Sequence, residues 1–151
     1  ISGNGYVWPF VDPLWKNHLD TQGSRDMSHL NNFIRSIPWW ELVPSGLNGM
    51  RNLITSGGGM DANQDYIAAA ANPTGTLLVA YVPPAHQGGF TVNTTGMGEI
   101  LDASWFDPTS GIYLKLSDSP SNNKSTRKFT PPARNSVGQH DWVLVVRRAG
   151  K

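Results

Sequence analysis

The spacing of hydrophobic positions changes once along the chain, near residues 43–46. Between Arg25 and Ile37 the apolar residues recur every three or four positions, which places them on one face of a helix. Thr21 or Ser24 can cap the start of this helix, and Pro38 ends it because proline lacks the amide hydrogen. An isolated helix of this length is marginal, so its apolar face needs a surface to pack on. The first part of the chain therefore predicts a loop and one amphipathic helix.

Beyond residue 45 the apolar residues fall in short runs that are separated by turn-forming sequences. The turn at residues 107–111 suits a hairpin, because its proline presets φ and its glycine accepts a positive φ. Seven or eight short strands in a stretch of this length fit a two-sheet antiparallel sandwich. The predicted strands are residues 50–55, 66–71, 77–82, 90–93, 100–106, 112–116, 127–130 and 142–147.

Aromatic residues within these runs indicate where the core lies. Trp105 and Trp142 lie within predicted strands that also contain Leu, Ile or Val, so we expect both rings to be buried. For Tyr81, Tyr113 and Phe129 the register decides which face each ring occupies, and the pattern leaves both faces open.

Length and composition narrow the class of protein. The 151 residues are too few for a complete (β/α)₈ barrel, which typically needs roughly 250. With 16 Gly, 11 Pro and 15% charged residues, the chain suits a turn-rich β domain better than a helical bundle. A net charge of +1 provides no basic field for nucleic acid, and no apolar run approaches the roughly 20 residues that span a bilayer. We therefore expect neither nucleic acid nor a membrane as a partner.

Most catalytic and metal-binding motifs are missing from the sequence. The absence of cysteine excludes disulfides, cysteine-ligated zinc and thiol nucleophiles. There is no G-x-S-x-G element, no Gly-rich phosphate loop and no H-E-x-x-H helix, and we expect packing or turn roles for His29 and His140. We predict that the chain uses no cofactor.

One loop resembles the start of a calcium site. Asp61, Asn63 and Asp65 alternate as calcium ligands do, but Tyr66 and Asn72 occupy the places where an EF-hand needs Gly and Glu. A looser calcium site on these three residues remains the alternative to a Gly-rich connection whose polar side chains bind backbone amides.

Six segments, in this order, carry a resemblance to a known family. They are GNGYVWPF (3–10), WKNHLDT (15–21), PWWELVP (38–44), WFDPTSG (105–111), FTPP (129–132) and DWVLV (141–145). The set resembles the C-terminal part of apiosidase-like glycoside hydrolases, in which a (β/α)₈ catalytic barrel precedes a β-sandwich named as a collagen-binding domain of a collagenase. The resemblance covers nearly the whole chain.

The resemblance implies two parts. Residues 1–44 would be a remnant of the last strand, loop and helix of a barrel, and residues 45–151 the complete accessory sandwich. The expected fold is therefore mainly β: an immunoglobulin-like antiparallel β-sandwich preceded by one amphipathic helix and a barrel-edge remnant. Since the chain opens at Ile1 without an export signal, we interpret it as a fragment or a processed product.

The resemblance also implies that this chain lacks catalytic residues. Glycosidases use two carboxylates, and in this family they lie on barrel strands upstream of every segment present here. Asn4, Tyr6 and Trp8 would face substrate at the barrel rim, with Trp8 stacking on a sugar, although Gly5 replaces a histidine that is frequent in similar sequences. We expect Trp39 and Trp40 to wedge the helix against the sandwich.

These expectations favour a non-catalytic C-terminal accessory module of a secreted carbohydrate-active enzyme, extracellular or periplasmic. Its partners would be the upstream barrel of the same parent chain and a polysaccharide. The alternative is a fragment or subunit that cleaves glycosidic bonds only together with the missing barrel. A lesser alternative is binding of collagen or extracellular matrix, which follows the domain's name.

Overall fold

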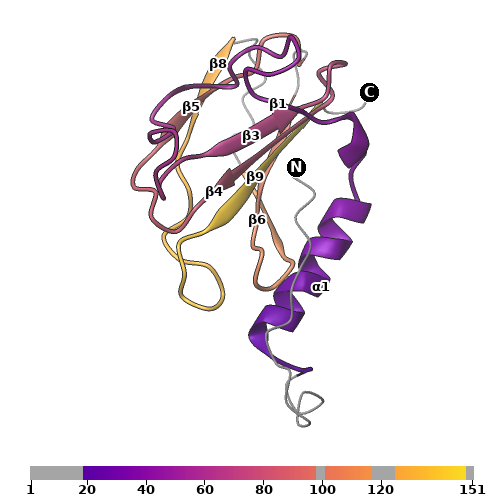
Figure 1. The fold of residues 1–151 in the computed structure, drawn as a ribbon, viewed down its shortest axis with the longest axis vertical. Helices are drawn as coiled ribbons and strands as arrows, with labels where there is room; N and C mark the ends of the chain where they lie inside the picture. Colours follow the sequence, from indigo (N-terminus) through magenta and orange to yellow (C-terminus); the bar gives the residue numbers. More distant parts are fainter. Residues whose placement is uncertain (1–18, 98–100, 117–124, 149–151) are drawn as a thin grey trace.

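The computed structural model describes residues 19–97, 101–116 and 125–148, which form three layers (Figure 1). The middle layer is a six-stranded antiparallel sheet in the order β1-β3-β4-β9-β6-β7, and one of its faces packs on a three-stranded antiparallel sheet, β2-β5-β8. Helix α1 packs on the other face. The elements are α1 (Gln22–Arg35), the 3₁₀ turn η2 (Trp39–Glu41), β1 (Val43–Pro44), β2 (Ile54–Ser56), β3 (Ala68–Ala71), β4 (Leu77–Val82), β5 (Phe90–Asn93), β6 (Leu101–Phe106), β7 (Tyr113–Lys115), β8 (Thr126–Phe129) and β9 (Trp142–Arg148).

Helix α1 begins at the expected cap. The Thr21 hydroxyl accepts a hydrogen bond from the Ser24 amide at 3.3 Å, which satisfies one of the free amides of the first turn. The helix ends at Arg35, three residues before Pro38. The predicted helix is thus confirmed, with a start three residues and an end two residues earlier than the predicted range 25–37.

The main core lies between the two sheets. Trp105 and Trp142 are 1% and 2% exposed, which confirms that both rings are core residues. Phe90 from the three-stranded sheet packs edge-on against Trp105, with the ring centroids 6.2 Å apart. Phe129 is buried as well, whereas Tyr81 and Tyr113 point to the opposite face of the six-stranded sheet and are exposed.

A second, smaller core joins α1 to the six-stranded sheet. Because neighbouring residues of a strand face opposite sides, Val143 and Val145 of β9 turn to the helix while Leu144 turns to the main core. The run from Trp142 to Val146 is therefore buried on both faces of the sheet. The buried members of the second core are Phe33, Ile37, Leu77, Phe106, Val143 and Val145.

The structure confirms the mainly β fold with two antiparallel sheets and one helix, and it corrects one packing prediction. Trp39 and Trp40 are 46% and 70% exposed, so the expectation that they wedge the helix against the sandwich is wrong. Phe33 and Ile37 occupy that position instead, and η2 turns both tryptophans outward.

The segment after η2 enters the sheet as β1, a strand that the sequence pattern did not predict. Val43 and Pro44 pair with Ala71 and Ala70 of β3. The predicted domain boundary after residue 44 stays a prediction, and the barrel-edge remnant predicted in residues 1–18 lies outside the described residues. No helix in the described ranges has the length and apolar character needed to span a membrane.

Candidate functional site

Helix α1 leaves a hollow on each of its sides along the outer face of the six-stranded sheet. The hollow toward β6 and β7, here called the polar cleft, has a volume of about 340 Å³. The hollow toward β3 and β4, here called the apolar groove, has a volume of about 470 Å³. Both volumes fall in the range of roughly 300–1,000 Å³ that is usual for ligand pockets. The polar cleft is lined by His29, Asn32, Phe33, Ser36, Ser104, Phe106, Ser110, Gly111, Tyr113 and Arg147.

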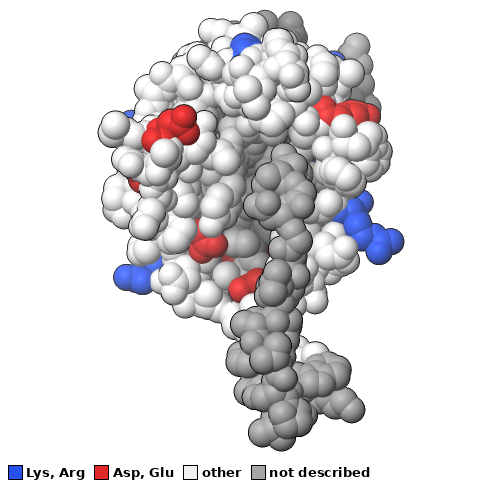
Figure 2. Space-filling view, in the orientation of Figure 1, with Lys and Arg blue, Asp and Glu red and all other residues white. Residues whose placement is uncertain are grey.

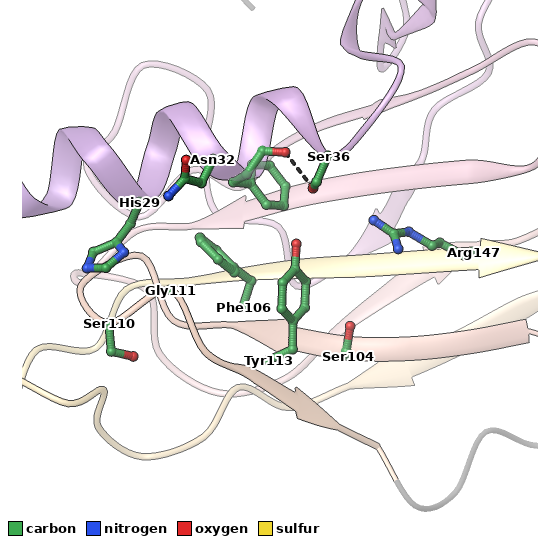
Figure 3. Close-up of a pocket in the computed structure, with 10 residues that line it drawn as sticks. His29, Asn32, Ser36, Ser104, Phe106, Ser110, Gly111, Tyr113 and Arg147 are labelled. Atoms are coloured by element: carbon green, nitrogen blue, oxygen red, sulfur yellow. Dashed lines mark hydrogen bonds between the residues drawn. The ribbon is translucent and has the colours of Figure 1, made fainter.

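Three aromatic rings of the polar cleft are in contact in series, with Phe106 in the middle of the row; Figure 3 labels Phe106 and Tyr113. The centroids of Phe33 and Phe106 are 4.7 Å apart, and those of Phe106 and Tyr113 are 5.0 Å apart. Tyr113 closes this row and is 41% exposed, so one end of the row is open to a ligand. Its hydroxyl points toward α1 (Figure 3).

Polar groups surround the exposed ring of Tyr113. His29 and Asn32 come from α1, Ser104 comes from β6, and the Arg147 guanidinium extends from β9 toward Tyr113 (Figure 3). Among the described residues, the Arg147 side chain forms no ion pair or hydrogen bond. Its cross-strand neighbour Asp102 is paired with Lys115 at 3.3 Å instead.

A buried carboxylate holds the turn at one end of the polar cleft. Asp107 is 3% exposed and accepts hydrogen bonds from the amide and hydroxyl of both Thr109 and Ser136, at 2.6 to 2.9 Å. Burial by itself raises the pKa of Asp107, but these four hydrogen bonds outweigh it and hold that pKa well below its usual range. Asp107 therefore stays ionised as a structural group.

The same turn touches the helix through a glycine. Gly111 has φ of +75°, and a β-carbon there would lie 2.7 Å from Nδ1 of His29. Only glycine accommodates both this conformation and this close approach. Gln22 adds a hydrogen bond from its side-chain amide to the Thr109 carbonyl, at 3.3 Å.

The apolar groove has a different character. Side chains of Met27, Leu30 and Ile34 line it from α1, and Val79 and Tyr81 line it from β4. Figure 2 shows that charged side chains are sparse on the face of the molecule drawn there.

Two ionisable groups at the apolar groove reflect its apolar surroundings. Burial, and secondarily the charge of Asp141, raises the pKa of Tyr81. Burial also raises the pKa of Asp141, and the charges of Asp107 and Asp26 add to this effect; together they outweigh the hydrogen bonds that the carboxylate accepts from its own backbone amide and from Asn135. In both groups the surroundings disfavour the charged form relative to the free side chain, as expected beside an apolar surface.

Glycosidic bond cleavage needs two carboxylates on opposite sides of the scissile bond. The residues that line the polar cleft include no carboxylate. Asp26 and Asp141 line the apolar groove, where Asp26 accepts a hydrogen bond from Gln22 at 2.7 Å and Asp141 accepts one from Asn135 at 2.8 Å. These two acids are the pair to test for catalysis.

The structure describes some of the binding residues that the sequence suggested and not others. Asn4, Tyr6 and Trp8 fall outside the described residues, so their sugar-binding role stays a prediction. In the calcium-like loop, Asp61 and Asn63 are exposed, and a carboxylate oxygen of Asp61 accepts a hydrogen bond from the Ala62 amide at 3.0 Å.

The loop's third residue, Asp65, has a buried carboxylate oxygen without a hydrogen-bond partner. In the part of the chain that the structure describes, no group of three or more His, Cys, Asp or Glu residues is arranged to hold a metal ion. A calcium site that also uses amide and carbonyl oxygens stays a prediction.

The fold and these hollows define a two-sheet β-sandwich module with a helix attached to its outer face. The model of the family described as "Putative collagen-binding domain of a collagenase" matches residues 51–147, and the chain belongs to this family. No curated protein matches the sequence.

Two solved structures share the fold. One is titled a glycoside hydrolase; its TM-score is 0.70 at 21% identity, over 100% of this chain and 31% of that one. The other is a glycoside hydrolase family 5 protein from Bacteroides vulgatus ATCC 8482, with a TM-score of 0.68 at 21% identity, over 91% of this chain and 27% of that one. The chain thus spans less than a third of either protein.

Proposed function

We propose that the chain is a non-catalytic C-terminal accessory module of a secreted carbohydrate-active enzyme, and that it docks on the (β/α)₈ barrel of that enzyme. The observation that carries this proposal is the apolar groove. Among the described residues, Met27, Leu30 and Ile34 on α1 and Val79 on β4 line an apolar surface beside the helix. Such a surface is typical of a protein interface.

Two further observations support a barrel as the docking partner. Residues 1–44, which include α1, resemble the last strand, loop and helix of a barrel. A barrel helix packs on its own strand and on neighbouring helices, so α1 needs a second apolar side in addition to the side that Phe33 and Ile37 bury on the sheet. The match to the first glycoside hydrolase structure covers 100% of this chain, α1 included, which is compatible with this arrangement.

A second role, holding polysaccharide near the enzyme, is favoured by the polar cleft. The cleft combines the exposed ring of Tyr113 with amide, hydroxyl and guanidinium groups, and this combination suits a sugar. The apolar C–H face of the sugar can stack on the tyrosine ring while the sugar hydroxyls form hydrogen bonds with the polar groups. The family's description suggests collagen as a third kind of ligand.

The glycosidase alternative can be tested directly on this chain. Incubated by itself with plant-type oligosaccharides, the chain is expected to release no sugar. Turnover that disappears in Asp26→Asn or Asp141→Asn would instead identify the apolar groove as a catalytic site and overturn the non-catalytic assignment.

Docking is tested by placing a charge in the apolar groove of the parent enzyme. Val79→Glu is expected to lower the melting temperature of the parent more than that of the isolated chain, because the interface is lost in addition to local packing. Thr126→Glu, at an exposed position of β8, serves as the control. Equal effects of Val79→Glu in the two contexts would refute docking through this groove.

A further inference from the structure

We propose that the polar cleft binds a hexuronate residue of an acidic polysaccharide, with the sugar carboxylate on Arg147 and the sugar ring against Tyr113. The inference rests on the proposed carbohydrate role of this cleft, and it adds the chemical class of the sugar. It does not depend on docking, because the apolar groove lies on the other side of α1.

The charge of the cleft argues for an acidic ligand. Of the described residues that line the cleft, Arg147 is the one with a permanent charge, and none of them carries a negative charge. In the described part of the chain the guanidinium has no partner, and the one acid opposite it in the sheet, Asp102, is held by Lys115. A planar guanidinium matches a carboxylate with two parallel hydrogen bonds.

The position of Arg147 follows from the strand to which it belongs. Residues of β9 alternate between the two faces, so Arg147 shares the helix-side face with Val143 and Val145. Those two valines are buried by α1, whereas Arg147 lies beyond the covered area and lines the open cleft. The sheet thus fixes the Cα and Cβ atoms of Arg147 at the bottom of the cleft.

The remaining cleft groups suit a sugar rather than a simple anion. Tyr113 offers an exposed ring that is supported from behind by Phe106, at a centroid distance of 5.0 Å. Asn32 on α1 and Ser104 on β6 line the same cleft with an amide and a hydroxyl, both able to donate to and accept from sugar hydroxyls (Figure 3). An inorganic anion would use the guanidinium but gain nothing from the ring.

The experiment compares two oligosaccharides of equal length by isothermal titration calorimetry on the whole chain. Trigalacturonate is expected to bind at least about tenfold more tightly than neutral galactotriose, since only a uronate carboxylate can form a bidentate ion pair with the Arg147 guanidinium. Binding of trigalacturonate is also expected to weaken as salt is raised.

Three variants assign the binding to this cleft. Arg147→Gln is expected to weaken trigalacturonate binding about tenfold or more and to weaken galactotriose binding much less, because the glutamine amide can still bind a sugar hydroxyl but cannot pair with a carboxylate. Lys128→Gln removes the same charge from β8, in the other sheet, and is expected to change neither. Tyr113→Ala is expected to weaken both sugars, and Tyr113→Phe, which keeps the ring, to preserve both.

Each opposite result has a definite meaning. Equal affinity for the two sugars, with Arg147→Gln behaving like Lys128→Gln, would overturn the acidic preference and leave a general carbohydrate role. Binding of galactotriose but not of trigalacturonate would likewise overturn the acidic preference alone. Failure of both sugars to bind, or binding of a collagen triple-helical peptide in their place, would overturn the inference together with the carbohydrate role of the cleft.

Discussion

The rings of Phe33 and Phe106 lie 4.7 Å apart, with an interplanar angle of 32°, and this contact joins helix α1 to the six-stranded sheet. Phe33 is the one buried residue within α1, and Phe106 also supports Tyr113 from the other side. Both hollows share these two phenylalanines in their linings. The helix contact and the two candidate binding surfaces therefore depend on the same pair of side chains.

Phe33→Ala is expected to detach α1 without unfolding the sandwich. Loss of a buried phenylalanine costs about 3–5 kcal/mol, and here the loss falls on the smaller core alone. Hydrogen exchange should show α1 losing protection while β4 and β9 keep theirs. Leu30→Ala, on the same helix but 46% exposed, is the control and should cost less than about 1 kcal/mol. Uniform loss of protection would contradict two separate cores.

Trp105→Ala acts on the main core. The ring is 1% exposed and packs against Phe90, so its removal is expected to destabilise the chain by about 3–5 kcal/mol. Urea denaturation measures this change directly. An unchanged unfolding midpoint would show that the ring does not lie between the sheets.

Asp107→Asn should alter the dependence of stability on pH. Because the folded-state pKa of Asp107 is depressed, its contribution is complete above the unfolded value near 3.8 and is lost as pH falls through the folded-state pKa. The unmodified chain should therefore lose stability as pH falls below about 4, and the variant should lack much of this loss. At neutral pH the variant should be less stable by about 1–3 kcal/mol, because the NH2 group that replaces one carboxylate oxygen cannot accept the backbone amide hydrogen of Ser136 or, in the other orientation, that of Thr109.

Asp141→Asn is expected to change the dependence of stability on pH in the direction opposite to Asp107→Asn. The folded-state pKa of Asp141 is raised, so ionisation of this group costs stability as pH rises above 3.8. Removing the charge should therefore stabilise the chain slightly at neutral pH. Chemical denaturation at pH 3 and pH 7 distinguishes the two variants. If both substitutions changed the free energy of unfolding in the same direction between these pH values, the assigned pKa directions would be contradicted.

A chain truncated to begin at Ser45 tests the predicted boundary. The main core is drawn from residues 50–146, so this chain is expected to unfold cooperatively. It should be less stable than a chain that begins at Leu42, because it lacks the pairing of β1 with β3. The comparison isolates this pairing, since both truncated chains lack α1 and expose the face of the sheet that α1 covers. A non-cooperative transition in calorimetry would show that residues 1–44 belong to the sandwich.

The fold was largely predictable because its determinants are local. Turn residues mark the strand ends, and the period of the apolar residues separates α1 from the strands. Strand β1 was not predictable, because two residues, Val43 and Pro44, carry no periodic signal and pair only through contact with β3. Burial of Trp39 and Trp40 was wrongly predicted, since hydrophobicity alone does not tell which residues after a helix face the sheet.

The candidate site was less predictable for a physical reason. Alternation along β9 places Arg147 on the same face as Val143 and Val145, and that much can be read from the sequence. That α1 covers the valines but stops short of Arg147 depends on where Phe33 meets Phe106, which is a tertiary contact. Because the polar cleft depends on that tertiary contact, no sequence motif predicts it.

Hydrogen exchange measured on the isolated chain and on the same residues within the parent enzyme tests the accessory role most directly. The account predicts that α1 around Leu30 and β4 around Val79 exchange more slowly in the parent, while β5 and β8 on the far sheet exchange equally in both. Identical exchange of α1 and β4 in the two proteins would contradict docking of this module on a barrel.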